Sequence, residues 1–256
     1  AIAHYSAQRL TAGATPATVQ REISCLRRMF RLGLKQHLLS TVPAFEQIEQ
    51  NGTNARQGFF EDQDFQKVCA ALPPHLQVLT IVAYWTGARK GELLKLEWRH
   101  VDLKSGKVQL EAGMVKSKHA RSFFLPPDAL QAIQRWKRIT KEWELQHQCT
   151  VPTVFHLDGQ RIRDFRGAWD HAFEVAGVSR KLFHDLRRSS VRNYIRSGVP
   201  KSVCRSISGH LTDSIFDRYD IQDDADKQAA AQAIAQRLHE VRNGEAMGKE
   251  QLCETV

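Results

Sequence analysis

HDLRRSSVRNYIRSGVPKSVCRSISGHLTDSIFDRY, residues 184–219, is the segment that best discriminates between possible folds for this chain. It begins with His184 and Arg187, which lie three residues apart and share one face of a helix. An imidazole beside the fixed fork of a guanidinium suits a phosphodiester under attack. The segment continues through His210 and ends at Tyr219, nine residues later. Taken alone, an H-x-x-R pair is also common on ordinary helix surfaces.

Positive charge is concentrated around the same segment. Between Val178 and Tyr219 the sequence holds nine Lys or Arg residues and three Asp residues, a net charge of +6. The whole chain has 37 Lys and Arg against 28 Asp and Glu, a net charge of +9, and its pI is near 9.5. Such a concentration favours a polyanionic partner bound through its phosphates. On charge alone, a basic protein without such a partner is the alternative.

Tyr219 differs from the other three tyrosines in its surroundings. Tyr84 lies in an apolar run and Tyr194 shares a helix face with apolar residues, so we expect both in the core. Tyr5 belongs to the short leading segment. Charged residues flank Tyr219 on both sides, which favours a reachable hydroxyl. An ordinary half-exposed tyrosine is the alternative.

A second motif, TGARKGE, occupies residues 86–92. Gly87 permits a sharp turn, and we expect Arg89 in the first turn of the helix that follows. Free N–H groups and the helix dipole favour an anion at that position. Glu92 lies one turn further and can orient the guanidinium. By itself the motif also fits a routine helix start with a surface ion pair.

Apolar periodicity predicts a mainly α fold with one small three-stranded antiparallel sheet, an α+β arrangement. Thr15 and Pro16 form a good N-cap and first-position pair for a helix whose apolar stripe runs from Val19 to Leu34. The polar, turn-rich segment 51–58 is the best linker candidate. The three strands are expected at residues 101–103, 108–110 and 122–125.

Cysteine usage and hydropathy exclude several classes of protein. The 256 residues contain five cysteines that are widely spaced and form no CxxC pair. This argues against a disulfide framework and a zinc site and fits the reducing cytoplasm. No apolar run reaches the roughly 18 residues of a membrane span, and we find no signal peptide. The chain begins at Ala1 rather than Met, so we expect a preceding N-terminal segment in the natural protein.

The order of these motifs is similar to the signature of the tyrosine recombinase (phage integrase) family. T-G-x-R-x-x-E, a strand-flanked Lys, H-x-x-R, G-H and then Tyr occur in this order. The resemblance covers nearly the whole chain and implies the DNA breaking-rejoining catalytic fold over residues 56–256, with a tail helix from about 223. Residues 1–55 resemble the end of a helical, DNA-clamping core-binding domain. Two residues depart from the family's pattern: Ser208 stands where the family usually has an apolar residue or Thr, and Phe124 where it commonly has Pro. We expect neither to touch a catalytic group.

The resemblance places the catalytic lysine at Lys116 rather than at Lys118. The family pattern is a Lys, an Arg five residues later and a short strand that ends in Leu-Pro. Arg121 and the Leu-Pro at 125–126 match that spacing when it is counted from Lys116. Lys118 has no Arg at the required distance, and we expect it to contact phosphate.

The resemblance implies a metal-free and ATP-free strand transfer at a specific site on double-stranded DNA. It implies that Tyr219 attacks the phosphate and forms a 3′-phosphotyrosyl link. It also implies a homo-tetramer assembled on the DNA and no membrane as a partner. No cofactor is expected, because arginines supply the charge that a metal supplies elsewhere. The implied catalytic set is Arg89, Lys116, His184, Arg187, His210 and Tyr219.

Three other functions are open at this stage. A type IB topoisomerase or hairpin-forming resolvase uses the same chemistry and would relax supercoiled DNA without a specific site. A catalytically silent DNA-binding relative would retain the fold, although the intact catalytic set speaks against it. A basic RNA-binding module would need interleaved aromatic platforms, which the sequence lacks.

Overall fold

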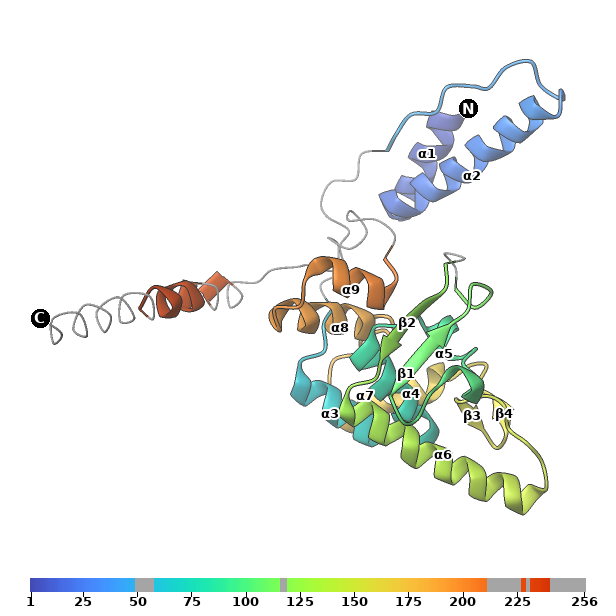
Figure 1. Ribbon diagram of the computed structural model, residues 1–256. Coiled ribbons are helices and arrows are strands. Elements are labelled where there is room, and N and C mark those ends of the chain that lie inside the picture. The colour runs from blue at the N-terminus through green and yellow to red at the C-terminus, as the bar shows by residue number, and fades with distance from the viewer. Residues whose placement is uncertain (49–57, 116–118, 211–226, 229–230, 240–256) are drawn as a thin grey trace, which may run out of the picture. The chain divides into compact units, whose positions relative to one another are not determined.

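The computed structural model describes residues 1–48, 58–115, 119–210, 227–228 and 231–239 (Figure 1). The chain divides into two compact units, Ala1–Arg56 and Gln57–Val256. No helix among the described residues is both long enough and apolar enough to cross a membrane.

The described part of the first unit, residues 1–48, contains two helices, α1 (Ile2–Thr11) and α2 (Pro16–Lys35). Thr15 caps α2, because its side chain accepts a hydrogen bond from the backbone N–H of Thr18, the third residue of the helix, as its sequence predicts. Glu22 joins the two helices through an ion pair of 2.7 Å with Arg9. This polar link holds α1 against α2.

The second unit is mainly helical around a central apolar helix, which confirms the expected fold class. Helix α4 packs against α3, α6 and α8, and most of its apolar side chains are buried. Residues 231–239 are also helical, within the expected tail helix. The helices are α3 (Asp62–Ala71), α4 (Pro74–Thr86), α5 (Lys90–Leu93), α6 (Pro127–His147), α7 (Arg166–Ala176), α8 (Asp185–Arg196) and α9 (Lys201–Ser208), with a 3-10 turn η1 (Trp98–His100).

Two small antiparallel hairpins accompany these helices. Strand β1 (Lys107–Leu110) pairs with β2 (Arg121–Phe124), and β3 (His156–Leu157) pairs with β4 (Gln160–Arg161). The expected first strand at 101–103 is reduced to one isolated bridge, between Val101 and β1. Among the described residues the sheet therefore has two strands rather than three, while its antiparallel character is as predicted.

Helix α8 is anchored to the beginning of the second unit. The backbone N–H of Phe60 donates to the Ser189 hydroxyl at 2.7 Å, and Arg192 forms an ion pair of 2.7 Å with Glu61. Leu186 on the same helix is completely buried in the core. These contacts fix the helix that begins with the H-x-x-R motif.

Candidate active site

The turn between α4 and α5 positions the first arginine. Gly87 ends α4 with a φ of +62°, and a Cβ at this position would lie 3.1 Å from the Ser190 hydroxyl, so glycine suits both the conformation and the space. Arg89 is the N-cap of α5 rather than a residue of its first turn. Its Nη1 donates to Glu92 at 2.9 Å, and its backbone N–H donates to the same carboxylate. Glu92 therefore orients Arg89, as the spacing predicts.

A second guanidinium binds the same carboxylate. Arg121 on β2 donates to both oxygens of Glu92, at 2.7 and 3.2 Å, and its Nε donates to the Ile207 carbonyl at 3.1 Å. Burial raises the pKa of the Glu92 carboxyl, but the hydrogen bonds from Arg121 and Arg89 outweigh burial and hold that pKa below its ordinary value. The sequence identified Arg121 only as a spacing marker and did not reveal this contact.

The H-x-x-R motif lies at the beginning of α8. His184 is the N-cap residue, and Arg187, three residues later, is only 2% exposed. The Nη1 of Arg187 donates to the Gly87 carbonyl at 2.7 Å and to the Ser208 carbonyl, while Nη2 donates to His210 Nε2 at 2.8 Å. Two carbonyls thus fix the direction of this guanidinium.

The G-H motif follows α9 and faces the same guanidinium. Gly209 ends the helix with a φ of +71°, which turns His210 back into the interior, where it is 5% exposed. The Nδ1 of His210 lies 2.8 Å from the Ser208 hydroxyl. Burial, followed by the charges of Arg187 and Arg89, lowers the pKa of His210 to about 3, so the ring is neutral near pH 7.

The three motifs meet at one place although they lie far apart in the sequence. Arg89 Nη2 donates to the Gly209 carbonyl at 3.2 Å, so the turn after α9 contacts both arginines. Helix α9 packs against α8 and against β2 (Figure 1). Burial and the charges of Arg187 and Arg89 lower the pKa of His184, which leaves a neutral imidazole beside the two guanidinium groups. The structure therefore brings together Arg89, His184, Arg187 and His210.

A pocket of about 280 Å³ opens beside Arg89 and extends to the tip of the β1–β2 hairpin. The chain enters residues 116–118 directly after Val115, which lines this pocket. Lys116, Lys118 and Tyr219 lie outside the described residues, so their places in the site remain expectations. The lining residues are Arg89, Gly91, Glu92, Lys95, Gly113, Met114 and Val115.

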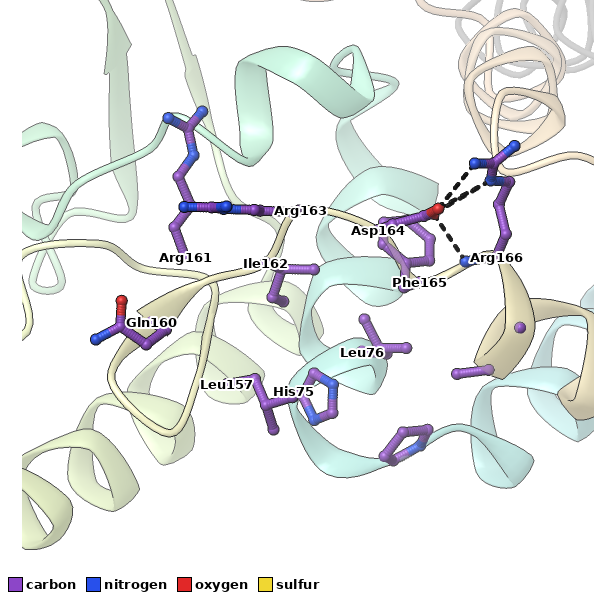
Figure 2. A pocket seen from close by; sticks show the side chains of 13 residues that line it. His75, Leu76, Leu157, Gln160, Arg161, Ile162, Arg163, Asp164, Phe165 and Arg166 are labelled. Atoms are coloured by element: carbon purple, nitrogen blue, oxygen red, sulfur yellow. Dashed lines mark hydrogen bonds and ion pairs between the residues drawn. The ribbon is translucent and has the colours of Figure 1, made fainter.

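A larger pocket of about 820 Å³ lies between the β3–β4 hairpin and the beginnings of α4 and α7 (Figure 2). None of the four clustered residues lines it. Asp164 and Arg166 form an exposed ion pair of 2.9 Å at its edge. We place the candidate active site at the guanidinium cluster rather than here. In the cluster the buried guanidinium of Arg187 contacts a buried imidazole, that of His210, whereas Arg166 at this pocket is 81% exposed.

Comparison with known proteins identifies relatives of this chain. A family model described as "Phage integrase family" matches residues 60–226. The integrase of Salmonella phage P22 is 23% identical over 80% of this chain and 54% of its own length. The shufflon-specific DNA recombinase of Escherichia coli is also 23% identical, over 80% of this chain and 51% of its own. The chain spans about half the length of these curated relatives.

Solved structures share the fold at low sequence identity. The lambda integrase(75–356) dimer bound to a COC′ core site has a TM-score of 0.63 and 20% identity, and the match covers 84% of this chain and 79% of that one. The Tn1549 transposon integrase in complex with transposon right end DNA has a TM-score of 0.72 and 12% identity, over 91% of this chain and 84% of that one. At these identities the likeness establishes the fold alone.

Proposed function

The chain belongs to the phage integrase family, and on that premise we propose that it is a tyrosine-type site-specific DNA recombinase. It would cut and rejoin DNA strands through a 3′-phosphotyrosyl intermediate. One observation carries the proposal, namely that Arg89 and Arg187 converge on the turn that holds His210. Two fixed guanidinium groups and a neutral imidazole around one point match the needs of a phosphodiester in its transition state.

The two arginines bind the non-bridging phosphate oxygens, on which negative charge grows in the transition state. Arg187 suits this role because carbonyl groups already fix its orientation, so little reorganisation is needed when DNA binds. Arg89 is oriented in the same way by Glu92. His210 adds a hydrogen-bond donor to the same oxygens.

Proton transfer is assigned to three further groups. Tyr219 is the nucleophile, and a phenol of pKa about 10 needs a base near pH 7. His184 is that base, and its lowered pKa supports the assignment because the neutral ring can accept a proton. Lys116 protonates the departing 5′-oxygen. Its place in the sequence, directly after the pocket beside Arg89, supports this role.

The substrate is double-stranded DNA at a specific site, on which the chain assembles as a homo-tetramer in the cytoplasm. Lambda integrase, which shares the fold, has been solved as a tetramer bound to a Holliday junction. Residues 1–55 are the end of the DNA-clamping domain, and residues 56–256 are the catalytic domain. Arginines along the polar side of α2 support the first assignment.

A nicked suicide substrate tests the proposal. It carries the attachment site mapped from the junctions between the element and its host DNA, and it traps the covalent intermediate because the cut strand diffuses away. The unsubstituted chain should form a protein–DNA adduct, and Tyr219→Phe should bind the same DNA without forming one. Tyr194→Phe is the matched control, since its hydroxyl only donates to a backbone carbonyl. An adduct with Tyr219→Phe, or none with the unsubstituted chain, would overturn the proposal.

A further inference from the structure

Both ring nitrogens of His210 are engaged in the structure. Nε2 faces Arg187, with Nη2 at 2.8 Å and Nε at 3.3 Å. Nδ1 faces the Ser208 hydroxyl at 2.8 Å. Ser208 is only 1% exposed and is the last residue of α9. The histidine is thus held between a group that only donates hydrogen bonds and a group that can donate or accept them.

These contacts determine where the hydrogen atoms lie. A guanidinium has no lone pair to offer, so Nε2 must accept and carries no hydrogen. The neutral ring then carries its hydrogen on Nδ1 and donates it to the Ser208 hydroxyl. Ser208 in turn donates its own hydrogen to the Cys204 carbonyl at 2.7 Å. The Nδ1 hydrogen and the Ser208 hydroxyl hydrogen thus each have an acceptor.

A hydrogen on Nδ1 and none on Nε2 satisfies the contacts of the DNA-free protein, but it is unfavourable once a phosphate binds. Under the proposed function, the non-bridging oxygens of the phosphate approach the guanidinium that now contacts Nε2. An unprotonated Nε2 would direct its lone pair at those anionic oxygens and repel them. His210 therefore has to present a hydrogen on Nε2 when DNA binds.

We propose that Ser208 is a positioning residue that allows this change, an inference that rests on the proposed function. As DNA binds, a phosphate oxygen takes the place of Nε2 on the Arg187 guanidinium. Solvent then accepts the proton of Nδ1 and supplies one to Nε2, so the ring stays neutral. The Ser208 hydroxyl turns its hydrogen from the Cys204 carbonyl to Nδ1. That carbonyl keeps the regular helical acceptor position for the amide four residues later.

The alternative is an imidazolium that donates from both nitrogens. Burial opposes it most, and the charges of four neighbouring groups add to burial in lowering the pKa of His210. The groups are Arg187, Arg89, His184 and Arg121.

Substitution of Ser208 tests the proposal through the rate of adduct formation at saturating DNA. Ser208→Ala should form the adduct roughly tenfold more slowly, the effect of about one buried hydrogen bond, with unchanged DNA affinity. Ser208→Thr should recover most of the rate because it keeps the hydroxyl. Ser206→Ala is the matched control, since this neighbouring serine donates only to a backbone carbonyl at the exposed surface. Adduct formation by Ser208→Ala at the unsubstituted rate would overturn the role of Ser208.

A spectroscopic measurement shows which ring nitrogen of His210 carries the hydrogen, and it does not depend on the stability of Ser208→Ala. In ¹⁵N-histidine NMR of the DNA-free chain, His210 should show a protonated Nδ1 and an unprotonated Nε2. In the Tyr219→Phe variant bound to an uncut duplex of the attachment site, His210 should instead show a protonated Nε2 and an unprotonated Nδ1. An Nδ1 that keeps its hydrogen in the complex would overturn the proposal. Failure of the unsubstituted chain to form any adduct would instead overturn the proposed function.

Discussion

Arg121 and Glu92 form a buried, two-pronged ion pair between β2 and α5, with a shortest separation of 2.7 Å. Their side chains are 9% and 3% exposed. The same carboxylate also binds Arg89 at 2.9 Å. Glu92 therefore connects the hairpin that carries residues 116–118 with the arginine of the candidate active site.

Removing this carboxylate should destabilise the catalytic unit. Glu92→Ala would leave Arg121 buried without its counter-charge, and loss of one partner of a buried pair typically costs about 3 kcal/mol or more. The free energy of unfolding in urea measures the effect. Arg89 would also lose its orienting group, so adduct formation should fall in the fraction of protein that stays folded.

An exposed pair provides the control. Asp164 binds Arg166 with a similar geometry, but their side chains are 52% and 81% exposed. Solvent screens such pairs, so Asp164→Asn should leave the unfolding midpoint unchanged within error. If Glu92→Ala proves as harmless as Asp164→Asn, the carboxylate does not organise the site.

His210 should make the stability of the fold depend on pH. Its pKa is about 3 in the folded chain and close to the ordinary 6.5 in the unfolded chain. Between these values only the unfolded chain binds the proton, so stability is fully present above about pH 6.5 and falls as the pH is lowered. The slope from this residue is at most about 1.4 kcal/mol per pH unit.

Unfolding in urea at pH 7 and pH 5 measures this dependence. The unsubstituted chain should lose stability at pH 5, and His210→Asn should lose less because it has no group that titrates in this window. His184, whose pKa is also lowered by burial, will leave a residual pH dependence in that variant. Identical pH dependence in the two proteins would contradict a neutral, buried His210.

Local sequence signals predicted the local parts of the site. The spacing from Arg89 to Glu92 indicated their contact, and the Gly87 turn follows from a residue that tolerates positive φ. The contact between Arg121 and Glu92 could not be foreseen, because the two residues lie 29 positions apart and meet only through tertiary packing. The expectation that Ser208 touches no catalytic group was wrong, because its hydroxyl lies 2.8 Å from His210 Nδ1. That contact depends on the left-handed turn at the residue between them.

The missing strand has a local cause. Residues 101–103 alternate like a strand, but the Asp102 carboxylate accepts hydrogen bonds from the Lys104 backbone and the Ser105 hydroxyl. Such side-chain contacts compete with sheet pairing and favour a turn. Only Val101 therefore pairs with β1. The turn-forming potential of the aspartate outweighed the apolar alternation.

Strand cleavage should persist in EDTA. Two guanidinium groups already supply fixed positive charge at the candidate site, so the proposed chemistry needs no divalent cation. Adduct formation on the suicide substrate should proceed at the same rate with EDTA and with Mg²⁺. A magnesium-dependent nuclease assayed in the same buffers shows that chelation is complete. Cleavage that disappears in EDTA and returns with Mg²⁺ would contradict the proposed mechanism.

A better leaving group should restore cleavage by the Lys116→Ala variant. If Lys116 protonates the departing 5′-oxygen, Lys116→Ala will be severely impaired on normal DNA. A 5′-bridging phosphorothioate replaces that oxygen with sulfur, whose thiolate leaves without a proton, so the variant should recover most of its cleavage rate. Arg89→Ala and Arg187→Ala should stay slow on both substrates, because the non-bridging oxygens still need their charge.

Lys118 provides the comparison that separates the two lysines. It should contact phosphate, so Lys118→Ala should weaken DNA binding and show no selective gain on the sulfur substrate. Single-turnover rates at saturating DNA remove the binding difference and compare the chemical step alone. If Lys118→Ala is the variant that sulfur rescues, the spacing from Arg121 has been misread. The general acid would then be Lys118, and Lys116 would take the phosphate-contact role.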